Sequence, residues 1–146
     1  MPQFDDAAIS PAPVEEVWKL LYDPSRFPEW WQGMHTVEPR AHEGRGDYTM
    51  FLDGHPDFPM PQELRSNLSG RSVTVSCLVS DISFAWRLTP LQDGDGTEVS
   101  VHVEVPEQEA HRVEQQRAII RASLAALARA ATRVTGCSGS SRSSPP

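Results

Sequence analysis

The C-terminal part of the sequence constrains the fold most, because residues 107–134 have the pattern of one long amphipathic helix. At about 1.5 Å per residue, a helix of this length extends roughly 40 Å. Glutamates in its first turn and arginines in its last turn match the helix dipole. Its apolar stripe consists of Val113, Ile120, Leu124, Leu127, Ala131 and Val134. A helix with one apolar face must bury that face against another apolar surface.

The middle of the chain supplies such a surface through strands in which apolar and polar residues alternate. The valines from Val99 to Val105 alternate with polar residues, and the segment from Ile82 to Leu88 alternates in the same way. The Asp-Gly-Asp-Gly sequence at 93–96 is a hairpin signal between them. This alternation predicts an antiparallel sheet with one apolar and one solvated face. Further strands are expected from Met34 onward and at residues 47–52, 62–68 and 71–79.

The N-terminal segment adds an opening strand and two short helices. Residues 4–10 alternate weakly and are expected to form the strand. Pro13 suits the first turn of a helix, and the apolar residues of 14–21, Trp18 among them, recur at helical spacing. A second short helix is expected at 25–31.

This element order predicts one α+β domain at residues 1–136, in which an antiparallel sheet wraps around the C-terminal helix. The length of 146 residues suits a single domain. Gly136 is the expected C-cap of the long helix. Residues 137–146 form a Gly/Ser/Pro-rich tail that is expected to be disordered.

The composition argues against several classes of partner. A formal net charge of -7 gives an acidic surface that repels phosphate backbones and anionic lipids, so neither nucleic-acid binding nor a peripheral membrane role is expected. Stable membrane insertion is not expected either, because no apolar run approaches the roughly 18–20 residues of a transmembrane helix. The N-terminus lacks the basic and apolar regions of a signal peptide. Cys77 and Cys137 lie in unlike settings, so no disulfide is expected. We therefore expect a cytoplasmic protein, either a monomer or a homodimer.

Two stretches of the sequence resemble the SRPBCC (START-like, polyketide cyclase/dehydrase) superfamily. The first covers residues 9–18 and continues through 23–24 and 27–30. The second covers residues 86–90 and 94–99 and is followed by the long final helix. The resemblance implies the helix-grip fold, which is a curved antiparallel sheet around a long C-terminal helix, with two short helices after the first strand. It also implies a hydrophobic cavity between that helix and the sheet.

Candidate ligand-binding residues are those expected on the faces between the sheet and the helix, together with one residue of a proline-rich loop. They are Trp30, Trp31, Tyr48, Met50, Phe58, Leu64, Phe84, Trp86, Ile120, Ser123, Leu124 and Leu127. Each also fits ordinary core packing, and the pattern leaves both interpretations open. Tyr48 and Ser123 are the polar candidates. The loop at 53–61, which carries Phe58, either gates the mouth of a cavity or acts as a stiff connector.

Acid–base and metal chemistry find little support in the sequence. His102 alternates with valines and is expected to face solvent. Glu63 and Arg65 share one strand face and are expected to pair on the outside. The five histidines are scattered and lack metal-ligand spacing, and no Gly-x-Ser-x-Gly nucleophile motif occurs. No catalytic residue, metal or cofactor is therefore predicted.

Three functions remain open, in order of preference. The first is binding of a small hydrophobic ligand, such as a lipid, polyketide or aromatic metabolite, between helix and sheet. The second is a polyketide aromatase/cyclase, which requires a general acid or base inside the cavity. The third is a protein-interaction domain similar to the Hsp90 activators, which predicts a sealed or collapsed cavity and an exposed binding face.

Overall fold

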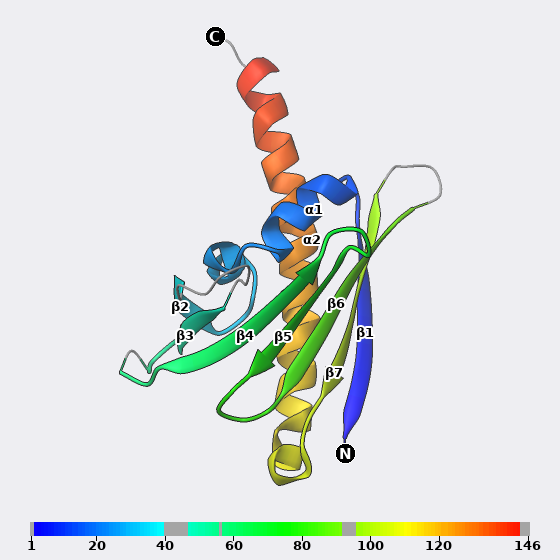
Figure 1. Cartoon of the computed structure of the whole chain (residues 1–146). Helices are drawn as coiled ribbons and strands as arrows, with labels where there is room; N and C mark the ends of the chain where they lie inside the picture. The colour runs from blue at the N-terminus through cyan, green and yellow to red at the C-terminus, as the bar shows by residue number, and fades with distance from the viewer. Residues whose placement is uncertain (1, 40–46, 56, 92–95, 144–146) are drawn as a thin grey trace.

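Seven antiparallel strands form one sheet, and a long helix, α2 (Val113–Ser143), lies along one of its faces (Figure 1). The computed structural model describes residues 2–39, 47–55, 57–91 and 96–143, with side chains up to Thr132. The other elements are β1 (Gln3–Ser10), α1 (Val14–Leu21), the 3-10 helix η1 (Pro24–Glu29), β2 (Met34–Pro39), β3 (Tyr48–Leu52), β4 (Met60–Asn67), β5 (Ser72–Cys77), β6 (Ser83–Pro90), β7 (Thr97–Glu104) and the 3-10 helix η2 (Glu107–Arg112).

The strands follow the order β1-β7-β6-β5-β4-β3-β2, so that β1 pairs with the last strand of the chain. From β2 to β7 each strand pairs with its neighbour in sequence. The register aligns apolar residues, with Val75 opposite Phe84 and Trp86 opposite Val101. Because side chains alternate between the two faces of a strand, this register gathers the apolar residues on the face toward α2.

The core lies between that face and α2. Along β6 and β7 every second residue is buried, as the alternation predicted. On α2, Ile120, Leu124 and Leu127 are fully buried at successive turns. Burying a side chain of this size contributes about 1.5–3 kcal/mol, so this stripe fixes the helix on the sheet. The predicted helix-grip arrangement of antiparallel sheet, long C-terminal helix and short N-terminal helices is confirmed.

The two short helices follow β1. α1 buries Val14, Val17, Leu20 and Leu21, whereas Trp18 is only half-buried and stacks on Tyr22 with 5.7 Å between ring centroids. In η1, the Asp23 side chain accepts a hydrogen bond from the Ser25 amide at 3.0 Å and caps the helix. The segment is a 3-10 helix because Pro28 lacks the amide hydrogen that a regular α-helix requires.

The long helix differs at both ends from the expected 107–134. Residues Glu107–Arg112 form a 3-10 segment, and the α-helix begins only at Val113. Short 3-10 turns are common at helix starts, where the first amides have no intrahelical acceptor. The helix continues to Ser143, past Gly136, because glycine costs about 1 kcal/mol in a helix without breaking it. The assignment of residues 137–146 to a tail stays a prediction.

Three smaller expectations also change. The strand expected at 71–79 ends at Cys77, since residues 78–80 form a turn and Asp81 adopts a φ of 63°. Met60 belongs to β4 and is buried, although the sequence analysis places it in the loop at 53–61. The hairpin signal at 93–96 lies, apart from Gly96, outside the described residues.

Candidate functional site: a cavity between the long helix and the sheet

A cavity of about 100 Å³ lies between the first turns of α2 and strands β2 to β6. Its apolar wall comes from eight residues: Trp31, Met34, Met50, Leu52, Met60, Ile82, Phe84 and Ile119. Its polar lining comes from eight others: Gln32, Tyr48, Gln62, Cys77, Ser80, Arg112, Gln115 and Gln116. The sheet contributes residues of alternate positions, because only one face of each strand is turned toward α2.

Aromatic and thioether side chains form most of the apolar wall. The Trp31 and Phe84 rings meet edge to face, with centroids 5.1 Å apart and planes at 85°. Edge-to-face contacts of this kind fix the rings relative to each other. Met34, Met50 and Met60 come from three neighbouring strands. Unbranched methionine side chains adapt to irregular shapes, so this part of the wall can follow the outline of an occupant.

Three polar residues lie side by side across the sheet and face the cavity. Tyr48 on β3 is directly opposite Gln62 on β4, and Gln62 is directly opposite Cys77 on β5. Directly opposite side chains in antiparallel strands have Cβ atoms about 4.5–5.5 Å apart. Hydroxyl, amide and thiol therefore form one continuous polar row on an otherwise apolar face. We refer to Tyr48, Gln62 and Cys77 as the polar row.

The Tyr48 side chain is completely buried, and its hydroxyl has no hydrogen-bond partner among the described residues. Burial raises the pKa of this phenol far above its ordinary range, and the neighbouring Cys77 adds to the effect. The group is therefore a neutral hydroxyl at any physiological pH. Its ring is held edge to face by Phe27, with centroids 5.5 Å apart. An unpaired buried hydroxyl is unfavourable and gains from any acceptor placed beside it.

Three other polar residues of the lining have partners. Gln62 Nε2 donates to the Met60 carbonyl at 3.3 Å, and Ser80 Oγ accepts from the Ile82 amide at 3.4 Å. Arg112 pairs with Glu109, with 3.2 Å between Nη1 and Oε1. Arg112 is half-buried and Gln115 is exposed, so these two residues form a rim where the cavity approaches solvent at the start of α2.

The predicted binding residues fall into separate groups in the structure. Trp31, Tyr48, Met50 and Phe84 line the cavity together. Trp30 and Trp86 lie beside it in the aromatic cluster, where Trp86 is 1% exposed and packs against Trp30 and Trp31. Four further residues are fully or almost fully buried in the core away from the cavity, namely Leu64, Ile120, Leu124 and Leu127.

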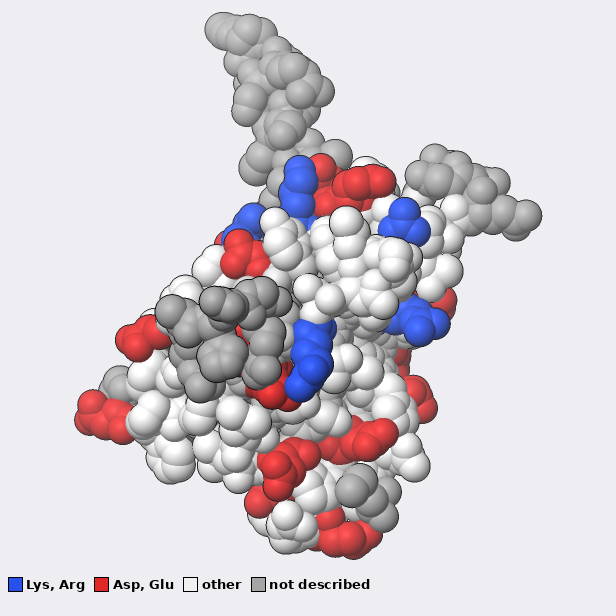
Figure 2. All heavy atoms as spheres, viewed as in Figure 1, with Lys and Arg blue, Asp and Glu red and all other residues white. Residues whose placement is uncertain are grey.

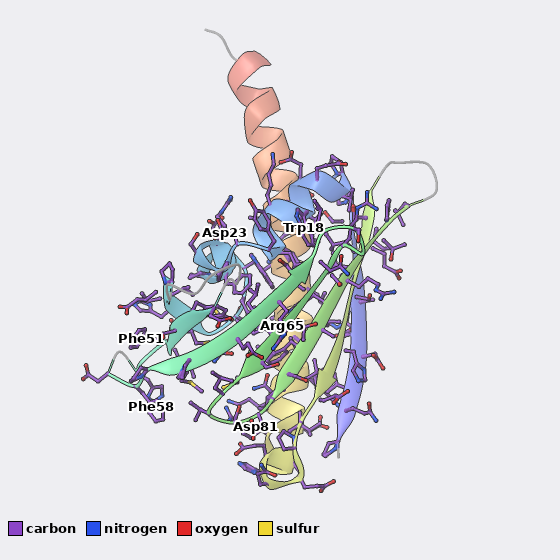
Figure 3. All side chains as sticks on the ribbon, viewed as in Figure 1. Trp18, Asp23, Phe51, Phe58, Arg65 and Asp81 are labelled. Carbon is purple, nitrogen blue, oxygen red and sulfur yellow. The ribbon has the colours of Figure 1, made fainter. Side chains whose placement is uncertain are left out.

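Phe58 and Ser123 also lie outside the lining. Phe58 is 56% exposed at the turn before β4 and projects from the body of the molecule (Figure 3). The Ser123 hydroxyl is already engaged on both sides. It accepts a hydrogen bond from the Gln32 amide at 2.9 Å and donates one to the Ile119 carbonyl at 2.7 Å. Ser123 therefore links α2 to the segment after η1.

Several lining residues were missed by the sequence analysis, although two of them carry a signal. Gln116 lies one turn before Ile120, so it continues the apolar stripe of α2 with a polar residue, and it is buried. Gln62 takes the buried position between Met60 and Leu64 on β4. A polar residue at a position where the pattern requires an apolar one marks a place where the interior has a polar surface. In β4 and in α2, this signal marks the part of the element that borders the cavity.

The opposite face of the sheet is polar and open. It holds a shallow depression of about 630 Å³ between β1 and β5, lined partly by Asp5, Thr74, Arg87 and His102. His102 faces this side, as predicted, and Glu63 and Arg65 pair with 3.3 Å between Oε1 and Nη2. Figure 3 looks onto this face, with Arg65 at its centre. Because the depression is shallow and is bordered by charged side chains, the smaller cavity under α2 is the better candidate for an apolar ligand.

Charge and metal ligands add no second site. Figure 2 shows acidic side chains at the end of the molecule where η2 and the β5–β6 turn lie. Within the described ranges, histidine, cysteine and acidic residues do not gather in a group able to hold a metal ion. No described helix is long and apolar enough to cross a bilayer.

Comparison with known proteins agrees with this architecture. Residues 1–132 match the family described as polyketide cyclase / dehydrase and lipid transport. Among curated proteins, none matches the chain.

Solved structures with the same fold include aromatase/cyclases and a protein named without an activity. Zhui aromatase/cyclase from Streptomyces sp. R1128 has a TM-score of 0.74 at 15% identity, covering 90% of this chain and 94% of that one. The di-domain ARO/CYC BexL from the BE-7585A biosynthetic pathway gives 0.74 at 15%, covering 88% of this chain and 46% of BexL. The protein XoxI from Bacillus cereus has a TM-score of 0.73 at 16% identity, covering 92% of this chain and 99% of XoxI. At such identities these likenesses show the fold alone.

Proposed function

Since the chain belongs to the polyketide cyclase / dehydrase and lipid transport family, we propose that it binds a small hydrophobic ligand in the cavity between α2 and the sheet. The observation that carries this proposal is an interior space lined by aromatic and methionine side chains and by Tyr48, whose buried hydroxyl has no partner among the described residues. An interior built only for stability fills its voids and pairs its polar groups. Of the predicted residues, Trp31, Tyr48, Met50 and Phe84 are the proposed ligand contacts.

The volume of the cavity limits the ligand. At about 100 Å³ it is comparable with the roughly 150 Å³ engineered cavity that accepts benzene. Pockets for drug-sized ligands are about 300–1,000 Å³. The cavity as it stands therefore suits a compact ligand. A multi-ring polyketide or a lipid would require Met34, Met50 and Met60 to move.

An aromatase/cyclase activity is the second candidate, because Zhui and BexL carry that name and share the fold. The chemistry requires a group that transfers protons inside the cavity. Among the described lining residues there is no aspartate, glutamate or histidine. Burial raises the pKa of Tyr48, which prevents this phenol from acting as a base at neutral pH. Ligand binding is therefore the first proposal and catalysis the second.

A protein-interaction function would agree best with a collapsed interior. The open volume beside Tyr48 argues against collapse. This function is therefore the third candidate.

Native mass spectrometry of the freshly purified protein tests the first proposal, followed by thermal-shift measurements with compact aromatic compounds. We expect either a retained small molecule or a rise in Tm with such a compound. Ile119 borders the cavity from α2, so Ile119→Phe should fill the space and abolish both signals. Ala125→Phe on the exposed side of α2 is the matched control and should retain them. A protein without bound molecule or Tm response would reject the proposal.

A further inference from the structure

The chemistry of the polar row indicates what kind of ligand the cavity takes. A phenol that is uncharged and lacks an acceptor can act toward a ligand as a hydrogen-bond donor. Tyr48 is held in place on three sides, by its strand, by the Phe27 ring and by Gln62 opposite. Tyr48 also lines the cavity, so its fixed ring determines where its hydroxyl can meet an acceptor. The complementary group is an oxygen or nitrogen acceptor carried by the ligand.

The charges around the cavity indicate that this acceptor is neutral. Arg112 is the one permanently charged residue of the described lining, and Glu109 already neutralises it with 3.2 Å between the paired atoms. A carboxylate placed beside Tyr48 would lose its hydration without gaining a free cation. Transfer of an unpaired charge into such a site is strongly unfavourable. A carbonyl oxygen accepts the same hydrogen bond with a much smaller desolvation penalty.

The apolar wall defines the rest of the ligand. Trp31 and Phe84 present aromatic surface on one side of the cavity, while Met50 and Met60 present adaptable thioether surface from β3 and β4. A flat ring can lie against aromatic surface and still fit a small volume. One ring bearing one carbonyl group matches both the size and the polarity of the space.

We infer that the ligand of this cavity is a compact, neutral carbonyl compound of about one ring, whose oxygen accepts a hydrogen bond from the Tyr48 hydroxyl. The inference rests on the proposed binding function and adds the chemical class of the ligand. Tyr48 is the residue that selects a carbonyl over a hydrocarbon. Gln62 and Cys77 continue the polar row on its side of the cavity.

Three probes of similar size test this selection, and isothermal titration calorimetry measures their binding. Acetophenone carries the neutral carbonyl, ethylbenzene replaces it with a methylene, and benzoate replaces it with a charge. Acetophenone should bind about 5- to 10-fold more tightly than ethylbenzene, which is the ratio expected for one net hydrogen bond. Benzoate should bind more weakly than both.

The variant Tyr48→Phe removes only the hydroxyl and keeps the ring. It should lose the preference for acetophenone, while ethylbenzene binding should change by less than about twofold. Thr132→Ala is the control, because it removes an exposed hydroxyl of α2 outside the cavity lining, and it should keep the preference. Equal binding of acetophenone and ethylbenzene to the native protein would overturn the inference and leave the proposed function standing. Tightest binding by benzoate would also overturn it. Failure of all three probes to bind would instead reject the binding of compact ligands.

Discussion

The Gln32 amide donates a hydrogen bond to the Ser123 hydroxyl at 2.9 Å, although the two residues are far apart in the sequence. The Ser123 hydroxyl in turn donates a hydrogen bond to the Ile119 carbonyl one turn earlier on α2. Gln32 follows Trp31, which forms part of the cavity wall. This hydrogen bond therefore fixes the position of Trp31 relative to the long helix. Ser123 thereby acts on the cavity without lining it.

Ser123→Ala should destabilise the protein, because the Gln32 amide would lose its acceptor. We expect a loss of about 1–3 kcal/mol, measured by urea unfolding. Thr132→Ala is the matched control, because its hydroxyl also donates to a helix carbonyl, that of Ala128 at 2.9 Å, but is exposed. The control should lose less than about 0.5 kcal/mol. Equal losses in the two variants would show that the link to Gln32 contributes nothing.

Trp86→Ala should be among the most destabilising single changes in the chain. Its ring is 1% exposed and meets Trp30 and Trp31 with centroid distances of 5.2 and 5.3 Å. Removal of a core aromatic ring costs about 3–5 kcal/mol. Denaturant unfolding would measure this loss of stability, provided that the variant has the same m-value as the native protein. Trp86→Phe should cost clearly less, since it keeps a ring and removes an indole N–H that has no partner among the described residues. A large loss of ligand binding at nearly unchanged stability would place Trp86 in the site instead of the core.

Met50→Ala and Leu124→Ala should separate the cavity from the core. Leu124 is completely buried in the stripe of α2, so its truncation should cost about 2–5 kcal/mol. Met50 is half-buried and already borders empty volume, so its truncation should cost only about 1 kcal/mol. The Met50 variant should also change the affinity for single-ring compounds. Calorimetric titration and thermal unfolding of both variants would check the pair, and the reverse ranking in stability would contradict the assigned boundary of the cavity.

His102 should make stability depend on pH. Its Nδ1 contacts Asp5 Oδ1 at 2.7 Å, and its Nε2 contacts Glu104 Oε2 at 3.2 Å. The hydrogen bond to Asp5 is the largest cause that raises the pKa of His102 above its ordinary 6.5. Because the folded pKa is the higher one, the stabilisation is complete below pH 6.5 and disappears as the pH rises through the folded pKa. The effect is small, because the imidazole side chain is 35% exposed and water screens the pair.

Thermal unfolding of the native protein and of His102→Gln across that pH range would measure this effect. The native protein should be the more stable of the two at acidic pH, and the difference should shrink toward alkaline pH. Asp5→Asn should flatten the same profile, since it removes the principal partner. A difference that grows with rising pH would contradict the assignment.

Much of the fold follows from two periodicities. The alternation in β6 and β7 and the stripe of Ile120, Leu124 and Leu127 fix which side of each element is buried. The same alternation predicts that Tyr48 and Phe84 face the interior. These are local properties of the chain, because the geometry of a strand or helix determines which residues share a face.

The exact place of the cavity could not be predicted from these patterns. Ile120 and Ile119 are neighbours, yet the first is buried in the core and the second borders empty space. The two side chains point about 100° apart around the helix axis. Whether each one meets the sheet or empty space depends on the sheet curvature and on how the 3-10 segment before Val113 positions the helix. Neither quantity is encoded in the spacing of apolar residues. Gln62 and Gln116, which are polar residues at positions where the pattern is otherwise apolar, are the part of the sequence that indicates where the cavity lies.

The pairing of the first strand with the last has a consequence for how the chain is made. Gln3 lies opposite Glu104, so the partner of β1 is synthesised about a hundred residues after it. During synthesis on the ribosome, β1 has no strand to pair with until β7 has emerged. The strands from β2 to β7, in contrast, can pair in the order in which they are synthesised. Such a long-range contact slows folding. The sheet is therefore completed at its N-terminal edge last, and the sequence of β1 must remain free of aggregation during that delay. Asp5 and Asp6, which place two negative charges in the middle of the strand, serve this requirement.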